Sequence, residues 1–211
     1  MMNRRFTWLT TLAGFFLANG FVFSDTLKGV FTFDGKPPRV ALAYFGEDSS
    51  LSIPSATVDQ VSKEFTTYLI VGAKDTKLQF KNSDNIDHNI YVNDNDAEVN
   101  FDVGLAEPGS VVSKPMDWKD NRVVRVSCKI HPNMRMYIAK ITSKYHVIVN
   151  LDKPGFDGKW EIKDVPAQFT KLSLWMPGLD PVETSIGPGK KASLKITKKS
   201  EERGSVALTR G

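Results

Sequence analysis

The sequence predicts an all-β fold built from sandwiches of short strands. Apolar and polar residues alternate over short runs, which is the pattern of strands with one buried face. The 15 glycines and 11 prolines are spread along the chain and separate these runs, as turn residues do. Helical periodicity is almost absent after the N-terminal segment. Many short strands punctuated by turns are typical of a β-sandwich.

The strands are expected in two series along the chain. Turns rich in proline and glycine separate them, for example at 34–38, 107–109, 153–155 and 177–178. The first series is expected at 28–33, 40–44, 68–72, 77–82, 89–93, 110–114, 123–128 and 136–142. The second series is expected at 145–150, 159–165, 171–176 and 191–197.

Residues 1–24 are expected to form a secretory signal peptide. Arg4 and Arg5 make the start basic, residues 6–17 are apolar, and small residues follow. This pattern predicts export to the periplasm. The apolar character extends as far as Phe23, so an uncleaved leader that anchors the chain in a membrane is the alternative.

Charge and composition narrow the class of protein. The full chain has a net charge of +4, and without Arg4 and Arg5 it keeps 26 basic and 24 acidic residues, or +2. No basic patch interleaved with aromatic residues appears, so nucleic acid is not an expected partner. With 211 residues, of which 41% are hydrophobic, the chain suits one large or two small β-rich domains.

One short segment carries the chemistry. Cys128, His131 and Met134 fall within seven residues, and His88 follows an Asn-rich turn upstream. One thiolate, two imidazoles and a long axial thioether form the trigonal set that binds copper in blue electron-transfer sites. Pro132 restricts the ligand loop, so the loop loses less entropy when it becomes ordered. A lone cysteine in an oxidising compartment also needs something to occupy its sulfur, and copper would do so.

Two strings resemble the small bacterial cupredoxins, amicyanin most closely. Cys-x2-His-Pro-x-Met-Arg, from Cys128 to Arg135, is similar to the short ligand loop of amicyanin. Asn-x5-His-Asn, from Asn82 to Asn89, is similar to its first-histidine segment. Asp87 departs from the pattern, because amicyanin has a proline before the first histidine.

The resemblance implies a complete ligand set for one type 1 copper ion. His88, Cys128 and His131 would be the equatorial ligands, and Met134 would be the axial ligand. Asn82 would tie the two ligand loops together by hydrogen bonds. Hydrogen bonds of this kind orient the ligands and tune the metal.

The axial position has a second candidate. Met136 stands where amicyanin has a glycine, and Cys128-x2-His131-x4-Met136 is the longer spacing that resembles plastocyanin and pseudoazurin. Met134 is favoured, because the short-loop string aligns without gaps and because residues 136–141 already have the pattern of the departing strand. Met136 is kept as the alternative axial ligand.

Nearly the whole chain resembles a group of bacterial methylamine-utilization proteins. In that group a cupredoxin domain lies within a transthyretin-like or carboxypeptidase-regulatory-like module, and segments 29–38 and 157–175 are similar to the two halves of such a module. The resemblance implies a cupredoxin Greek-key β-sandwich with a second, smaller discontinuous β-sandwich. The expected divisions are a cupredoxin domain at 55–143, the second sandwich at 25–54 and 144–200, and a tail at 201–211.

The expected function is that of an exported type 1 copper protein that shuttles single electrons and is not an enzyme. Catalysis would need an open coordination position, and only His146 remains once His88 and His131 are assigned. The expected partner is a redox protein, such as a c-type cytochrome or a periplasmic dehydrogenase, that docks transiently over a small area. A membrane partner is expected only if the leader stays uncleaved.

Two other functions stay open at this point. A periplasmic copper chaperone or storage protein would use the same soft ligands, but in a solvent-open site. A structural β-sandwich that serves as a binding module would ignore copper and use Trp118, Trp160 and Trp175 for interaction rather than for the core.

Overall fold

The computed structural model describes residues 24–211, and the all-β prediction is confirmed there. These residues form four sheets and contain no helix. The same residues accordingly contain no helix with the length and apolar character needed to cross a membrane. The expected signal peptide lies outside the described residues, except for Ser24, which begins the first strand.

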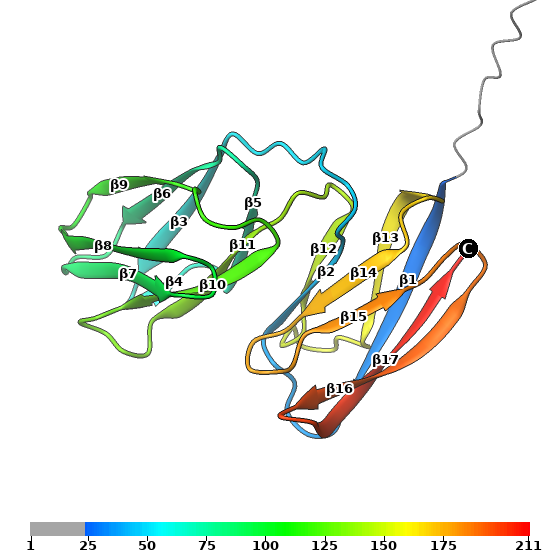
Figure 1. Ribbon diagram of the computed structural model, residues 1–211. Coiled ribbons are helices and arrows are strands. Elements are labelled where there is room, and N and C mark those ends of the chain that lie inside the picture. The colour runs from blue at the N-terminus through cyan, green and yellow to red at the C-terminus, as the bar shows by residue number, and fades with distance from the viewer. Residues whose placement is uncertain (1–23) are drawn as a thin grey trace, which may run out of the picture.

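One of two sandwiches, here called the ligand sandwich, uses the middle of the chain (Figure 1). Its strands are β3 (Ser55–Val61), β4 (Glu64–Phe65), β5 (Leu69–Gly72), β6 (Lys77–Asn82), β7 (His88–Asp94), β8 (Val99–Ala106), β9 (Val111–Pro115), β10 (Arg122–Cys128) and β11 (Arg135–Lys140). They form sheets of order β5-β11-β10-β7-β8 and β4-β3-β6-β9. Apolar side chains of both sheets, such as Phe80, Ile90 and Ile138, fill one core between them.

The other sandwich, here called the outer sandwich, is formed by two separated stretches of chain. Its strands are β1 (Ser24–Phe33), β2 (Val40–Phe45), β12 (His146–Asn150), β13 (Lys159–Pro166), β14 (Lys171–Trp175), β15 (Val182–Ser185), β16 (Lys191–Lys198) and β17 (Glu201–Arg210). They form sheets of order β13-β1-β17-β16 and β12-β2-β14-β15. Every strand of the ligand sandwich lies between β2 and β12 in the sequence, so the ligand sandwich is an insertion.

Strand β2 joins the two sandwiches, because both of its faces are buried. Ala43 and Phe45 point into the core of the outer sandwich. Leu42 and Tyr44, on the opposite face, belong to a separate cluster with Leu69 and other side chains of the ligand sandwich. A strand buried on both faces is a continuous apolar run rather than an alternating one, and residues 40–45 have that composition.

The C-terminal segment corrects one prediction. The sequence predicts a tail at 201–211, but β17 spans Glu201–Arg210 and pairs with both β1 and β16. The strand is hard to recognise from the sequence of this segment for two reasons. It begins with charged residues, and it contains Gly204 at a φ of 152°, beside a bulge in the pairing of β16 with β17.

Arg210 holds the end of β17 in place from inside the outer sandwich. Its side chain is 1% exposed, and its Nε donates a hydrogen bond to Asp25 Oδ1 at 2.7 Å. The two terminal nitrogens donate to backbone carbonyls, among them Ile186 O and Pro166 O at 2.8 Å each. A buried guanidinium is tolerated only when its donors are satisfied in this way.

Every strand that the sequence predicts is present, but several others are not anticipated. Apart from β17, these are β3, β4, β8 and β15. In β3 the buried face carries Gln60, which is fully buried, beside Val58. A polar residue at an inward position breaks the alternation by which strands are detected. In β8, by contrast, Val99, Phe101 and Val103 alternate with exposed polar or small residues, so the pattern was present in the sequence and was missed.

Candidate metal centre

The β7–β10 pairing brings the predicted ligands to one end of the ligand sandwich (Figure 1). His88 is the first residue of β7, and Cys128 is the last residue of β10. The two strands are antiparallel neighbours, with Cys128 paired to Ile90. The loop 129–134 then leads from β10 to β11 and carries His131.

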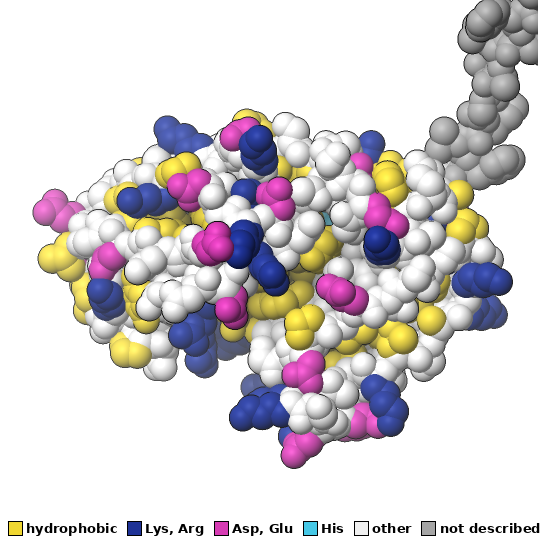
Figure 2. All heavy atoms as spheres, viewed as in Figure 1, with side chains coloured by type: hydrophobic (Ala, Val, Ile, Leu, Met, Phe, Trp, Pro, Cys, Tyr) yellow, Lys and Arg dark blue, Asp and Glu magenta, His cyan; other side chains and the backbone are white. Residues whose placement is uncertain are grey.

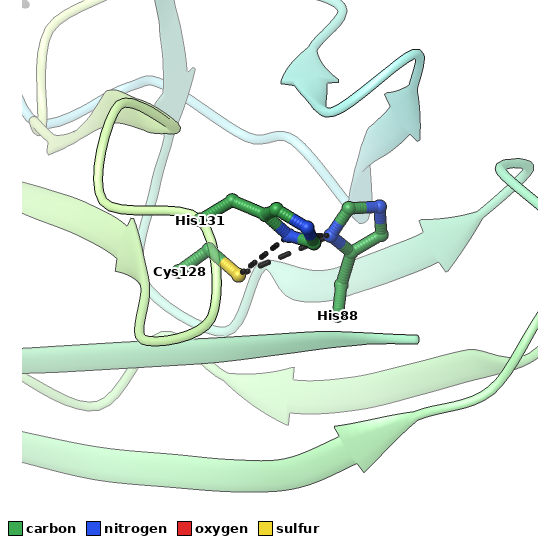
Figure 3. Close-up of side chains that lie close together, drawn as sticks. All are labelled: His88, Cys128 and His131. Atoms are coloured by element: carbon green, nitrogen blue, oxygen red, sulfur yellow. Dashed lines mark hydrogen bonds between the residues drawn. The ribbon is translucent and has the colours of Figure 1, made fainter. Parts of the chain in front are cut away.

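The two imidazoles and the thiol converge (Figure 3). Cys128 Sγ lies 3.9 Å from His88 Nδ1 and 3.8 Å from His131 Nδ1, and the two Nδ1 atoms are 3.1 Å apart. Metal bonds of about 2.0–2.1 Å to imidazole nitrogen and about 2.3 Å to thiolate sulfur require donor atoms about 3–4 Å apart. The donor set and its spacing therefore fit a single transition-metal ion. No second cluster of His, Cys, Asp and Glu of this kind occurs within residues 24–211.

Burial differs among the three ligands. His88 is fully buried and Cys128 is 2% exposed, whereas His131 is half-buried. One imidazole therefore faces solvent while the thiol is shielded. Burial also lowers the pKa of His131, and charge on His88 and Lys63 acts in the same direction. A lowered pKa favours the neutral imidazole, the form that binds metals.

The strand register separates the two methionine candidates. Cys128 N–H donates to Met134 O at 3.2 Å, so Met134 lies directly opposite the cysteine. Met136 instead pairs with Val126, two residues or about 7 Å deeper along the strands. Both side chains are buried, but the one beside the cysteine is Met134. His88, Cys128 and His131, with Met134 beside the cysteine, resemble a type 1 copper site, whereas Met136 lies deeper in the core to which both methionines belong.

Asp84 fixes the orientation of His88. Its carboxylate lies 3.1 Å from His88 Nε2, on the opposite side of the ring from Cys128. The hydrogen bond from the Lys63 backbone N–H is the main cause that lowers the pKa of Asp84, so the carboxylate is ionised. An ionised carboxylate only accepts hydrogen bonds, and Nε2 therefore carries the ring proton. The lone pair of Nδ1 then faces the cluster.

Asn82 corrects a second prediction. The sequence predicts that Asn82 ties the two ligand loops together, but the hydrogen bonds of this buried amide stay within the first-histidine side of the site. Its Nδ2 donates to Ile86 O and Ala106 O, both at 2.8 Å, and its Oδ1 accepts from Asp84 N–H at 3.0 Å. The amide therefore shapes the segment that holds Asp84 and His88, and leaves loop 129–134 to its own hydrogen bonds.

The link between the two ligand segments is made at the sulfur. Asn89 N–H donates to Cys128 Sγ at 3.4 Å. The Asn89 side chain is held in turn, because its Nδ2 donates to Asp102 and to Gly104 O. Lys129, the residue after the cysteine, forms an ion pair with Asp102. Asp102 therefore connects the residues that follow both buried ligands.

This connection has a testable pH dependence. The hydrogen bond from Lys129 is the main cause that lowers the pKa of Asp102 to about 2. Because the folded pKa lies below the unfolded one, the contribution of Asp102 to stability is present above about pH 4 and lost as the pH falls toward about 2. The urea midpoint of the metal-free protein should fall as the pH is lowered through this range. We expect it to fall less in Asp102→Asn than in the original protein. The exposed Asp117→Asn is the control, and an equal change in both variants would contradict the assignment.

Three supporting residues were not identified from the sequence. Asp84 and Asn89 stand close to His88 in the chain, and a search for hydrogen-bonding residues next to a ligand would have flagged both. Asp102 gives no such signal. It lies in β8, a strand that was not predicted, and it reaches the site only through the pairing of β7 with β8.

The comparisons with known proteins concern part of the chain. Neither a family model nor a curated protein matches it. A purple cupredoxin from Nitrosopumilus maritimus is 14% identical and covers 41% of this chain and 98% of its own, with a TM-score of 0.35. A mutant of amicyanin with Cu(I) is 12% identical and covers 49% of this chain and 98% of its own, with a TM-score of 0.36. About half of this chain is similar in structure to cupredoxins.

A copper-containing nitrite reductase from Thermus scotoductus is 20% identical over 43% of this chain, with a TM-score of 0.37. The match covers only 23% of that enzyme. Scores and identities this low carry no argument about what the present chain does. The assignment of the cupredoxin-like site therefore depends on the positions of its own ligand atoms.

Proposed function

We propose that the chain is an exported type 1 copper protein that carries single electrons between redox partners. One observation carries the proposal: the donor atoms of His88, Cys128 and His131 lie within 4.8 Å of one another, on a scaffold that buries the thiol. Copper bound there would supply a one-electron couple, tuned by the axial ligand and by the surroundings of the sulfur. The axial ligand in this proposal is Met134.

The protein's contribution is to hold these ligands in place. Cys128 is fixed by β10 and by the N–H of Asn89, and His88 by Asp84. The ligand loop is closed on itself, because Met134 N–H donates to His131 O at 2.9 Å. Ligands held this firmly change little when an electron arrives or leaves, which favours transfer over chemistry on a substrate.

Exchange of electrons is proposed at the half-buried His131. Ile130, its neighbour in the loop, is 46% exposed, and Leu105, opposite Asn89 at the adjoining end of β8, is 67% exposed. Exposed apolar side chains at the ligand end of the sandwich suit brief docking of a redox protein over a small area. A c-type cytochrome or a periplasmic dehydrogenase is the proposed class of partner.

Burial of the ligands favours this proposal over a copper chaperone or storage protein. A chaperone must release metal quickly, so its ligands need access to solvent or to the recipient protein. Here the thiol and one imidazole are almost fully shielded. A purely structural module is also disfavoured, since Trp118 and Trp160 are buried in the two cores and Trp175, the third candidate, is half-buried.

A copper titration of the full chain tests the proposal. We expect one copper ion per chain and intense visible absorption from the thiolate. The colour should vanish on reduction and return on oxidation, and a copper chelator should remove it reversibly. A colourless complex that exchanges copper rapidly would favour the chaperone, and an absence of binding would favour the structural module.

The same titration distinguishes the axial ligand. We expect Met134→Leu to keep the colour and to raise the reduction potential, because the weak thioether donor is lost. Met136→Leu is the matched control in the same core and should leave spectrum and potential near those of the original protein. A shift with Met136→Leu and none with Met134→Leu would make Met136 the axial ligand.

A further inference from the structure

A groove runs along the boundary between the two sandwiches. It consists of two hollows of about 490 and about 520 Å³ that share Lys36, Pro38 and Pro177, and it is here called the seam groove. Loops of the outer sandwich form one wall, and residues of β4, β11 and the ligand loop form part of the other. Figure 2 shows the outline of the molecule indented between the two lobes, with Lys and Arg side chains on both sides of the indentation.

Positive charge is concentrated in this groove. The basic lining residues are Lys36, Arg39, Arg135, Lys198 and Arg203, and the acidic ones are Asp34 and Glu64. The lining therefore carries a formal charge of +3, whereas residues 24–211 as a whole carry +2. The excess of basic over acidic residues in this lining makes the groove a place where an anion can bind.

Several of these cations lack an acidic partner. Arg39 is paired with Asp152, and Arg203 is paired with Glu201. Lys36, Arg135 and Lys198, by contrast, form no ion pair within the described part of the chain. Unpaired cations in a concave site hold carboxylates well, and a guanidinium does so with two parallel hydrogen bonds.

One end of the groove lies beside the ligand loop. Asn133 and Arg135 line it, and they flank Met134, the proposed axial ligand. Apolar surface from Phe65, Tyr137 and Pro177 lies between the charges. Alternating charged and apolar surface along two joined hollows suits an extended chain better than one compact small molecule.

We propose that the seam groove binds an extended acidic segment of the redox partner protein. The partner's role in electron transfer rests on the proposed function, whereas the acidic segment rests on the charge and shape of the groove. Carboxylates of the segment would lie against Lys36 on the outer wall and Arg135 on the ligand-loop wall. Such pairing would speed the encounter and hold the partner beside the ligand loop, which carries His131.

A labelled peptide tests the groove directly. The probe is a short fluorescein-labelled peptide in which glutamate alternates with proline and tyrosine, and its binding to the full chain is followed by fluorescence anisotropy. We expect binding at about 20 mM NaCl that weakens steeply by about 200 mM. The peptide with glutamine in place of glutamate should not bind.

Two double variants locate the site. Lys36→Gln with Arg135→Gln removes one cation from each wall and should weaken binding by roughly tenfold. Lys190→Gln with Lys191→Gln is the matched control. It removes two exposed cations at the start of β16, whereas the groove residue Lys198 stands at the other end of that strand. Equal weakening by both pairs, or none by the first pair, would overturn the groove as the binding site. Urea unfolding checks that each variant is folded.

The measurement is made on metal-free and on copper-loaded protein, so that the two proposals fail separately. A chain that binds the peptide but gives no coloured copper complex would overturn the electron-transfer function and leave the acidic-segment site standing. A chain that gives the coloured copper complex but does not bind the peptide would overturn the groove site alone. Binding of the glutamine peptide with equal strength would also overturn it.

Discussion

Replacement of Cys128 by serine is expected to abolish the visible absorption of the copper-loaded protein. The absorption depends on strong donation from a thiolate, and a serine hydroxyl is a poor ligand for copper beside two imidazoles. The replacement is small and lies at the end of β10, so the sandwich should stay folded. The measurement is the visible spectrum after titration with copper, together with a urea unfolding curve of the metal-free protein.

The control for this variant is Met136→Leu, which alters the same core without removing a proposed ligand. It should keep the colour. Two results would contradict the assignment of Cys128 as the thiolate ligand. One is a serine variant that retains the absorption, and the other is an original protein whose colour persists after the thiol has been blocked chemically.

Replacement of Arg210 by methionine is expected to lower the free energy of unfolding by about 3–5 kcal/mol, because it leaves a partly buried carboxylate without its partner. The Arg210 side chain is fully shielded, and Asp25, which accepts its Nε hydrogen bond, is 15% exposed. Several backbone carbonyls would also lose their donor. Urea unfolding of the metal-free protein measures the loss.

Two further variants show whether the loss comes from the buried pair. Arg203→Met removes an exposed arginine from the same strand and should cost only about 0–1 kcal/mol. Asp25→Leu combined with Arg210→Met removes both charges and should recover part of the stability, because no unpaired charge stays buried. If Arg210→Met costs no more than Arg203→Met, the buried pair does not stabilise the outer sandwich.

The residues of the candidate metal centre could be found from the sequence because their chemistry is rare and local. Cys128, His131 and Met134 lie within one short loop, and strand alternation on either side of that loop predicts β10 and β11 correctly. His88 needs one further inference, which is that its strand lies beside β10. That pairing is present, and it brings His88 to within 3.9 Å of the sulfur.

The parts that were not predicted depend on long-range pairing or on buried polar groups. Asn82 was given the wrong hydrogen-bond partners, because the strand end that supplies Ala106 was itself unrecognised. Arg210 looks like an exposed residue in a tail, and only the folded outer sandwich provides the carbonyls and the carboxylate that allow it to be buried. Spacing and alternation contain no information on such contacts.

The pairing of β1 with β17 also determines the order in which the molecule can be assembled. Leu27 is paired with Arg210, so the sheet that contains both strands cannot close until Arg210 has been synthesised. The ligand sandwich needs only residues 55–140 and is free to fold earlier. Contacts between distant parts of a chain form slowly. The residues of the candidate metal centre can therefore be in place before β1 and β17 have paired.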